Sequence, residues 1–139
     1  MTIKQISIFI ENKNGTMLFV LDTLKEAGIQ IIASTVSDTV DYGIYRIICS
    51  DPVKAYEIMK ERKLSVTLTD VFAIELDDAP GMAAQAIRSI TSAGININYL
   101  YSFLFKGKGI LIFRTDDTEK TTETIMLSGL KFLTPETLR

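Results

Sequence analysis

Histidine is absent from this chain of 139 residues, and cysteine occurs once, as Cys49. Without histidine there is no Ser-His-Asp or Cys-His catalytic arrangement, and a metal site would have to use carboxylates alone. A lone cysteine excludes an intrachain disulfide and a thiolate zinc cluster. We therefore expect no catalytic residues, no metal and no other cofactor, and we expect Cys49 to be a small buried apolar side chain.

Long apolar runs and an excess of basic charge are missing as well. The apolar stretch Tyr99–Phe105 is far shorter than the roughly 18–20 residues of a membrane helix, and the N-terminus lacks the apolar core of a signal peptide. The 15 lysine and arginine residues oppose 17 acidic ones, for a net charge of −2. Nucleic-acid proteins that work through a basic face have the opposite balance. We expect a cytoplasmic protein that binds neither membrane nor nucleic acid.

What the chain does contain is an internal repeat. A shift of 66 residues, the distance from Gly15 to Gly81 along the chain, aligns identical residues without a gap. The shift also aligns Ala27-Gly28-Ile29 with Ala93-Gly94-Ile95, and Gly43-Ile44 with Gly109-Ile110. Most of these identities are glycines and their neighbours, where backbone geometry dictates the residue. We infer a duplication, with one domain at 1–69 and a second at 70–139.

Both halves predict the same order of elements, because period-two alternation marks strands and helical spacing of apolar residues marks helices. In the first half we expect strands at 3–10, 29–37, 44–50 and 64–69, with helices at 16–27 and 52–63. In the second half we expect strands at 70–76, 95–105, 109–115 and 130–133, with helices at 82–93 and 116–129. This βαββαβ order is the split ferredoxin-like unit. The sequence thus predicts an α+β fold of two such units packed side by side, joined by nearly continuous strand at 64–76.

The loop and helix around the second repeated glycine resemble the ACT domain family. The family motif is a strand that ends in an acidic or amide residue, then Pro-Gly, a helix, and Gly-hydrophobic-Asn-Ile. This chain has Leu76-Asp77-Asp78-Ala79-Pro80-Gly81-Met82, followed by Ala93-Gly94-Ile95-Asn96-Ile97. The first half carries a degraded copy, in which Asn14 replaces the proline and Gln30 replaces the asparagine. The resemblance covers the whole chain as a tandem pair.

The resemblance implies a regulatory protein, not an enzyme, that binds a small ligand, usually an amino acid, between domains packed side by side. The ligand-binding residues it implies are Asn12, Gly15, Thr16, Met17, Gln30, Asp78, Pro80, Gly81, Met82, Asn96 and Asn98. Physical chemistry agrees with this, because free N–H groups at a helix N-terminus attract a carboxylate and glycine lets it approach. Asparagine and aspartate side chains can accept hydrogen bonds from the ammonium group. Such a protein acts through a partner, for example a separate regulated enzyme.

Other interpretations of the same residues stay open. The glycines can be simple turn residues in a structural dimerisation module, and a small enzyme could use Asp78, Glu11 or Tyr101 as acid or base. Alternation predicts Asn96 and Asn98 on one face of their strand, with Ile95, Ile97 and Tyr99 on the other. The aromatic side chains Tyr99, Tyr101, Phe103 and Phe105 also recur at period two. An aromatic strand of this kind favours coverage by the other half or by a second chain, so we expect a homodimer.

Overall fold

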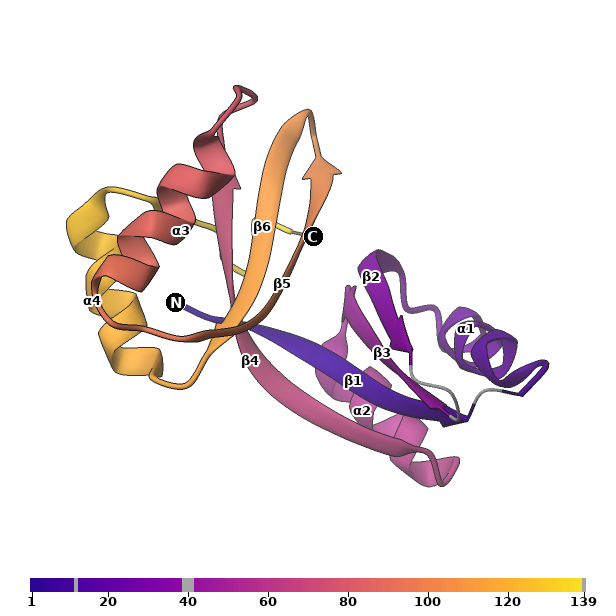
Figure 1. Ribbon diagram of the computed structural model, residues 1–139. Helices are drawn as coiled ribbons and strands as arrows, with labels where there is room; N and C mark the ends of the chain where they lie inside the picture. Colours follow the sequence, from indigo (N-terminus) through magenta and orange to yellow (C-terminus); the bar gives the residue numbers. More distant parts are fainter. Residues whose placement is uncertain (12, 39–41, 139) are drawn as a thin grey trace. The chain divides into compact units, whose positions relative to one another are not determined.

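A computed structural model describes residues 1–11, 13–38 and 42–138 (Figure 1). The elements of the N-terminal half are β1 (Ile3–Glu11), α1 (Thr16–Glu26), β2 (Ile31–Asp38), β3 (Tyr42–Cys49) and α2 (Pro52–Glu61), and β4 (Ser65–Leu76) follows. The C-terminal half continues with α3 (Met82–Ser92), β5 (Ile97–Phe105), β6 (Lys108–Thr115), α4 (Thr118–Ser128) and β7 (Lys131–Phe132). The chain forms two compact units, one of residues 4–69 with Leu138 and one of residues 1–3 and 70–137.

Both units have the split ferredoxin-like topology. In the first unit the strand order is β2-β3-β1-β4, and in the second it is β7-β4-β6-β5. Helices α1 and α2 contact each other in the first unit, as α3 and α4 do in the second. The predicted α+β fold of two βαββαβ units is confirmed.

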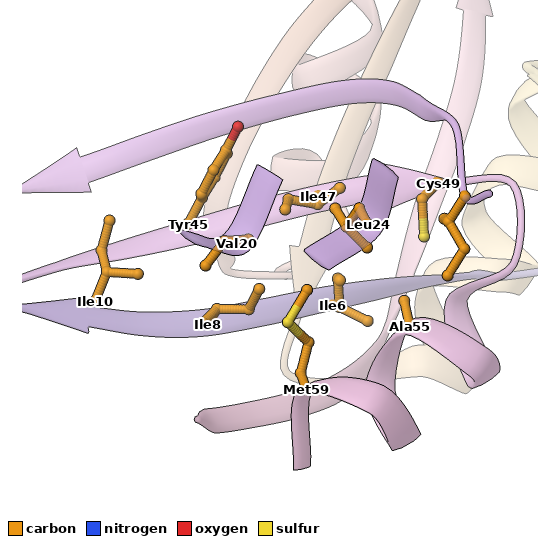
Figure 2. Packing of buried hydrophobic residues seen from close by; sticks show 11 residues of the cluster. Ile6, Ile8, Ile10, Val20, Leu24, Tyr45, Ile47, Cys49, Ala55 and Met59 are labelled. Atoms are coloured by element: carbon orange, nitrogen blue, oxygen red, sulfur yellow. The ribbon is translucent and has the colours of Figure 1, made fainter. Parts of the chain in front are cut away.

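The core of the first unit lies between its helices and one face of its sheet. Isoleucines 6, 8 and 10 of β1 point toward Val20 and Leu24 of α1 and Met59 of α2, as Figure 2 shows. Alternate residues of β3, among them Ile47 and Cys49, complete the cluster. Cys49 is buried, as the sequence predicts. This alternation is what one buried sheet face requires.

The core of the second unit uses the corresponding positions. Phe72 and Ile74 of β4 and Leu111 and Phe113 of β6 pack against α3 and α4 through side chains such as Ile90. The rings of Phe72 and Phe113, paired across the two strands, have centroids 5.5 Å apart. The apolar pattern of the repeat therefore fixes which sheet face each unit buries.

The predicted strands at 64–69 and 70–76 form the single strand β4. The boundary between the two compact units falls within it, after Thr69. β4 lies beside β1 in the first unit and between β6 and β7 in the second. The same strand thus belongs to both sheets.

Two strands, β2 and β5, each begin two residues later than the sequence predicts. β2 begins at Ile31 and β5 at Ile97, because the helix before each ends in a glycine with left-handed backbone. At the end of α1 the N–H of Ile29 still donates to the carbonyl of Leu24 at 3.0 Å, so the chain leaves the helix cap before it can join the sheet. The turn predicted at 38–43 includes residues 39–41, which lie outside the described residues.

A β-bulge changes the predicted faces of β5. Ile97 pairs with Thr115 while Tyr99 pairs with Arg114, and two consecutive residues of β6 point to opposite faces. Ile97 and Tyr99 therefore lie on opposite faces, and the prediction that they share one is wrong. β2 has the same irregularity between Ile31 and Ala33, at the equivalent place in the repeat. Simple alternation cannot foresee an inserted residue.

No helix in the part of the chain that the structure describes is long and apolar enough to cross a membrane.

Candidate functional site

Two glycine-capped loops lead into α1 and α3. Gly15 and Gly81, the N-cap residues, have φ angles of 91° and 85°. Both lie in the left-handed region, which glycine tolerates best. Within the described residues, a Cβ at either position would meet no atom within 4 Å, so the backbone angle and not crowding favours glycine.

The start of these two helices differs from the start of α2 and α4. Asp51 caps α2 by accepting a hydrogen bond from the Lys54 N–H at 3.2 Å, and Asp117 caps α4 by accepting one from Lys120 at 3.0 Å. Neither α1 nor α3 has a side-chain cap bond among the residues that the structure describes. The N–H groups of Thr16 and Met82 each donate to a loop carbonyl, of Lys13 and Ala79, at 3.4 Å. The N–H groups that follow in each first turn have no side-chain cap among the described residues, so they are available to an acceptor that is not part of the helix.

The loop before α3 borders a pocket of about 460 Å³. Its lining comes from the loop, the first turn of α3 and the β5–β6 hairpin: Leu76, Asp77, Asp78, Ala79, Met82, Ala83, Leu100, Ser102, Phe103, Leu104, Gly109, Ile110 and Leu111. Of the predicted site residues, Asp78 and Met82 contribute to this lining, and Pro80 and Gly81 do not. We call it the α3 loop pocket.

The loop before α1 borders an equivalent pocket of about 400 Å³. It is lined by Ile10, Glu11, Lys13, Thr16, Met17, Val36, Tyr42 and Gly43, most of which lie 66 residues before a residue of the α3 loop pocket. Thr16 and Met17 were predicted site residues. Gly15 lines a larger neighbouring pocket instead, and Asn12 lies outside the described residues. We call this the α1 loop pocket.

The predicted polar side chains of the strands lie elsewhere. Gln30 and Asn96, both exposed, precede β2 and β5 and line neither loop pocket. The Gln30 carbonyl accepts a hydrogen bond from the Ser50 N–H at 2.9 Å, and the Gln30 N–H donates to the Ser50 hydroxyl oxygen, Oγ, at 2.9 Å. The side-chain amide of Asn98 donates to Asp116 Oδ1 at 2.9 Å. Each glycine loop therefore lies beside the first turn of its own helix, whereas the side chains of Gln30, Asn96 and Asn98 line neither loop pocket.

Charges at the loop before α1 are internally paired. Lys13 Nζ lies 2.6 Å from Glu11 Oε2, and this carboxylate raises the pKa of the Lys13 ammonium above its ordinary 10.5. The Thr16 hydroxyl donates to the Glu11 carbonyl at 2.8 Å, which closes the loop onto the helix start. Across the described ranges, no three His, Cys, Asp or Glu side chains gather as metal ligands do.

Sequence reasoning missed one group of pocket residues. Phe9, Phe19 and Tyr42 line the larger pocket in the first unit, together with Lys63. The signal was available in the repeat: at the positions 66 residues later the chain has Glu75, Gln85 and Lys108 instead of the aromatic residues, and Gly129 instead of the lysine.

The fold and its two glycine-capped helices define a tandem pair of ferredoxin-like units. The chain belongs to the ACT domain pair family, whose family model matches residues 1–139. Among solved structures it is similar to protein BT0572 from Bacteroides thetaiotaomicron, with 33% identity and a TM-score of 0.94, over 99% of this chain and 96% of that one.

More distant structures share the fold. The ligand-free regulatory subunit of aspartate kinase from Thermus thermophilus is 17% identical, with a TM-score of 0.63 over 90% of this chain and 91% of that one. The regulatory subunit of aspartate kinase from Thermus flavus is 18% identical, with a TM-score of 0.60 over 91% and 92%. No curated protein matches the sequence.

Proposed function

We propose that this ACT domain pair is a regulatory protein that binds an amino acid at its glycine-capped helices and acts through a separate partner. The observation that carries the proposal is the difference in helix capping. Aspartates cap α2 and α4, whereas glycines occupy the N-caps of α1 and α3. A ligand carboxylate is the acceptor that such a helix start attracts, because it meets both free N–H groups and the positive end of the helix dipole.

The α3 loop pocket is the better candidate of the two, since its loop keeps the full Pro-Gly motif. The carboxylate would meet the start of α3 beside Gly81, while Asp78 accepts hydrogen bonds from the α-ammonium group. Met82, Leu100 and Leu104 line the same pocket and favour an apolar effector side chain. Gln30 remains the proposed strand partner of the ammonium group for the Gly81 loop, and Asn96 that for the loop of Asn12 and Gly15.

The proposed partner is supported by the regulatory subunits that share this fold. The aspartate kinase regulatory subunits with this fold are proteins that regulate an enzyme, and we propose the same relation for this chain. The direction of regulation depends on which state of the partner binds the loaded form more tightly.

The test is a thermal-shift screen against the twenty amino acids, followed by calorimetry with the one that binds. A specific ligand at a hundred times its dissociation constant stabilises the fold by about 2.7 kcal/mol. Asp78→Ala and Asn96→Ala should each weaken binding roughly fivefold to a hundredfold, since each removes a polar contact worth about 1–3 kcal/mol.

Glu119→Ala is the matched control, because Glu119 is an exposed carboxylate on α4 and lines neither loop pocket. The Glu119→Ala variant should bind the amino acid with the same affinity as the wild type. Equal binding by all three folded variants would contradict the site, and a folded wild type that binds no amino acid would favour a structural dimerisation module instead.

A further inference from the structure

The repeat allows one more pocket to be compared between the units. In each unit a pocket lies beside the turn that leads from the second helix into the last strand, with a volume of about 630 Å³ in the first unit and about 400 Å³ in the second. Positions 9–11, 16, 19, 42 and 63–65 line the first, and positions 75–77, 82, 85, 108 and 129–131 line the second. These nine positions of each pocket correspond under the shift of 66, whereas positions 13–15 line only the first pocket and positions 86, 89 and 128 line only the second.

The second pocket is lined by residues that form ion pairs with one another. Lys131 Nζ lies 2.9 Å from Glu75 Oε2, and Lys108 Nζ lies 4.0 Å from Glu75 Oε1. Glu75 is largely buried, with a side-chain exposure of 15%. Both lysines that line this pocket are thus paired with Glu75.

The first pocket has aromatic walls at the same places. Phe9, Phe19 and Tyr42 are 49%, 42% and 44% exposed, so each leaves much of its ring open to solvent. The rings of Phe9 and Tyr42 contact each other, with centroids 5.3 Å apart. Large exposed rings that converge on one concavity are typical of a binding site. We call it the aromatic pocket.

Lys63 is a second difference between this pocket and its counterpart. It has a left-handed backbone, with φ of 62°, at the end of α2, where its N–H donates to the Lys60 carbonyl. Gly129 occupies the same position at the end of α4, with φ of 70° and the same bonding pattern. A side chain there costs roughly 1–2 kcal/mol that glycine would not. Lys63 thus adds a cationic residue to the lining of the aromatic pocket at a position where the second unit has glycine.

Gly15 and Thr16, at the start of α1, line the aromatic pocket on another side. The pocket thus combines aromatic walls, the Lys63 cation and a helix start without a side-chain cap among the described residues. We propose that the aromatic pocket binds a small carboxylate that carries an aromatic ring. Its ring packs on Phe9, Phe19 and Tyr42, and its carboxylate meets Lys63 and the start of α1. The aromatic pocket shares Ile10, Glu11, Lys13, Thr16 and Tyr42 with the α1 loop pocket, and Phe9, Phe19 and Lys63 are its own. The proposal therefore rests on the proposed function and names the ligand class of the first unit.

The test is an NMR titration of the ¹⁵N-labelled chain with 3-phenylpropionate. The largest amide shifts should fall at 15–19 and 63–65. Two further probes separate the contributions: propionate lacks the ring, and 3-phenylpropanamide lacks the charge. Each should bind at least about tenfold more weakly. Shifts confined to the second unit, or equal binding by the amide, would overturn the proposal.

Two substitutions copy the second unit into the first. Phe19→Gln and Lys63→Gly should each weaken 3-phenylpropionate binding about tenfold, and Lys63→Gly should fold at least as stably because it relieves the left-handed lysine. Gln85→Ala, at the position equivalent to Phe19, is the matched control and should bind like the wild type. Asp78→Ala should also leave this affinity unchanged, whatever it does to amino-acid binding. Unchanged affinity in both Phe19→Gln and Lys63→Gly, with native spectra, would overturn the proposal.

Discussion

Cys49 lies in β3, within the apolar cluster of the first unit. Burial raises the pKa of its thiol from an ordinary 9.0 to about 11. At about pH 8 this leaves roughly a hundredfold less thiolate than in the unfolded chain, and the thiolate is the reactive form. We expect a disulfide reagent to modify the native chain at least a hundredfold more slowly than the urea-unfolded chain. Equal rates would contradict a buried Cys49.

The same shift in pKa predicts how stability changes with pH. Below the unfolded pKa of 9.0 the thiol is protonated in both states and adds no pH dependence. As the pH rises from about 9 to about 11, the unfolded chain loses a proton that the native chain keeps, so the free energy of unfolding falls. The measurement is this free energy for the wild type minus that for Cys49→Ala, which removes the contribution of other titrating groups. A constant difference across this range would be the contrary result.

Single residues also show where reading the sequence succeeds and where it fails. Gly15 and Gly81 were predictable, because the repeat preserves a backbone angle that only glycine adopts easily. The partner of Asn98 was not, since its bond to Asp116 spans 18 residues and depends on how β5 meets the end of β6. The duplication could be found from positions where the two halves have identical residues. To predict the aromatic pocket, one would have to compare the positions where the two halves differ.

Helices α2 and α4 begin at aspartates, and the contribution of such a cap is measurable. The Asp117 carboxylate accepts a hydrogen bond from the Lys120 N–H at 3.0 Å. Asp117→Ala should lower the free energy of unfolding by about 1 kcal/mol, within the usual range of about 0.5–2 for a lost cap. Glu123→Ala, an exposed change in the middle of α4, should stay within about 0.5 kcal/mol of the wild type in the same urea titration. A loss no larger than that of Glu123→Ala would contradict the capping role.

Strand β4 carries a second prediction at the scale of elements. A strand that is hydrogen-bonded within both sheets exposes no segment for a protease to bind. Thermolysin should therefore cut the native chain slowly within Ser65–Leu76 and the unfolded chain rapidly, as mass spectrometry of early fragments would show. Trypsin is uninformative because this segment contains neither lysine nor arginine. Rapid native cleavage near Thr69, with two stable fragments, would contradict a continuous β4.

Element order followed from the sequence because the alternation of apolar residues differs between strand and helix. The ends of the elements were predicted less accurately than their order. β2 and β5 begin later than predicted because the residues just before them still belong to the cap of the preceding helix. The hairpin between the predicted strands at 95–105 and 109–115 is confirmed, and its two turn residues, Lys106 and Gly107, both have the positive φ angles that a two-residue turn between strands requires. The bulge at the start of β5 had no signature in composition or period.

Across the whole molecule, the two halves keep their cores and change their pockets. Ile74 and Phe113 in the second unit occupy the positions of Ile8 and Ile47 in the first, and all four are buried apolar residues. Packing restricts those positions, while a pocket position such as Phe19 or Gln85 is free to diverge after duplication. We therefore expect the two units to differ in what they bind more than in how they fold.

Assembly is the last prediction. β5 is an edge strand of its sheet, and its side chains Leu100 and Leu104 are 48% and 79% exposed. An apolar edge strand invites pairing, so we expect a second chain to cover it and light scattering to give twice the chain mass of 15.5 kDa. Leu104→Glu should shift the mass to that of one chain, because a dimer contact would bury the new charge. Leu127→Glu changes an even more exposed leucine on α4, 89% accessible, and should leave the dimer intact. A wild-type mass of one chain at micromolar concentration would contradict the prediction without affecting the fold of either unit.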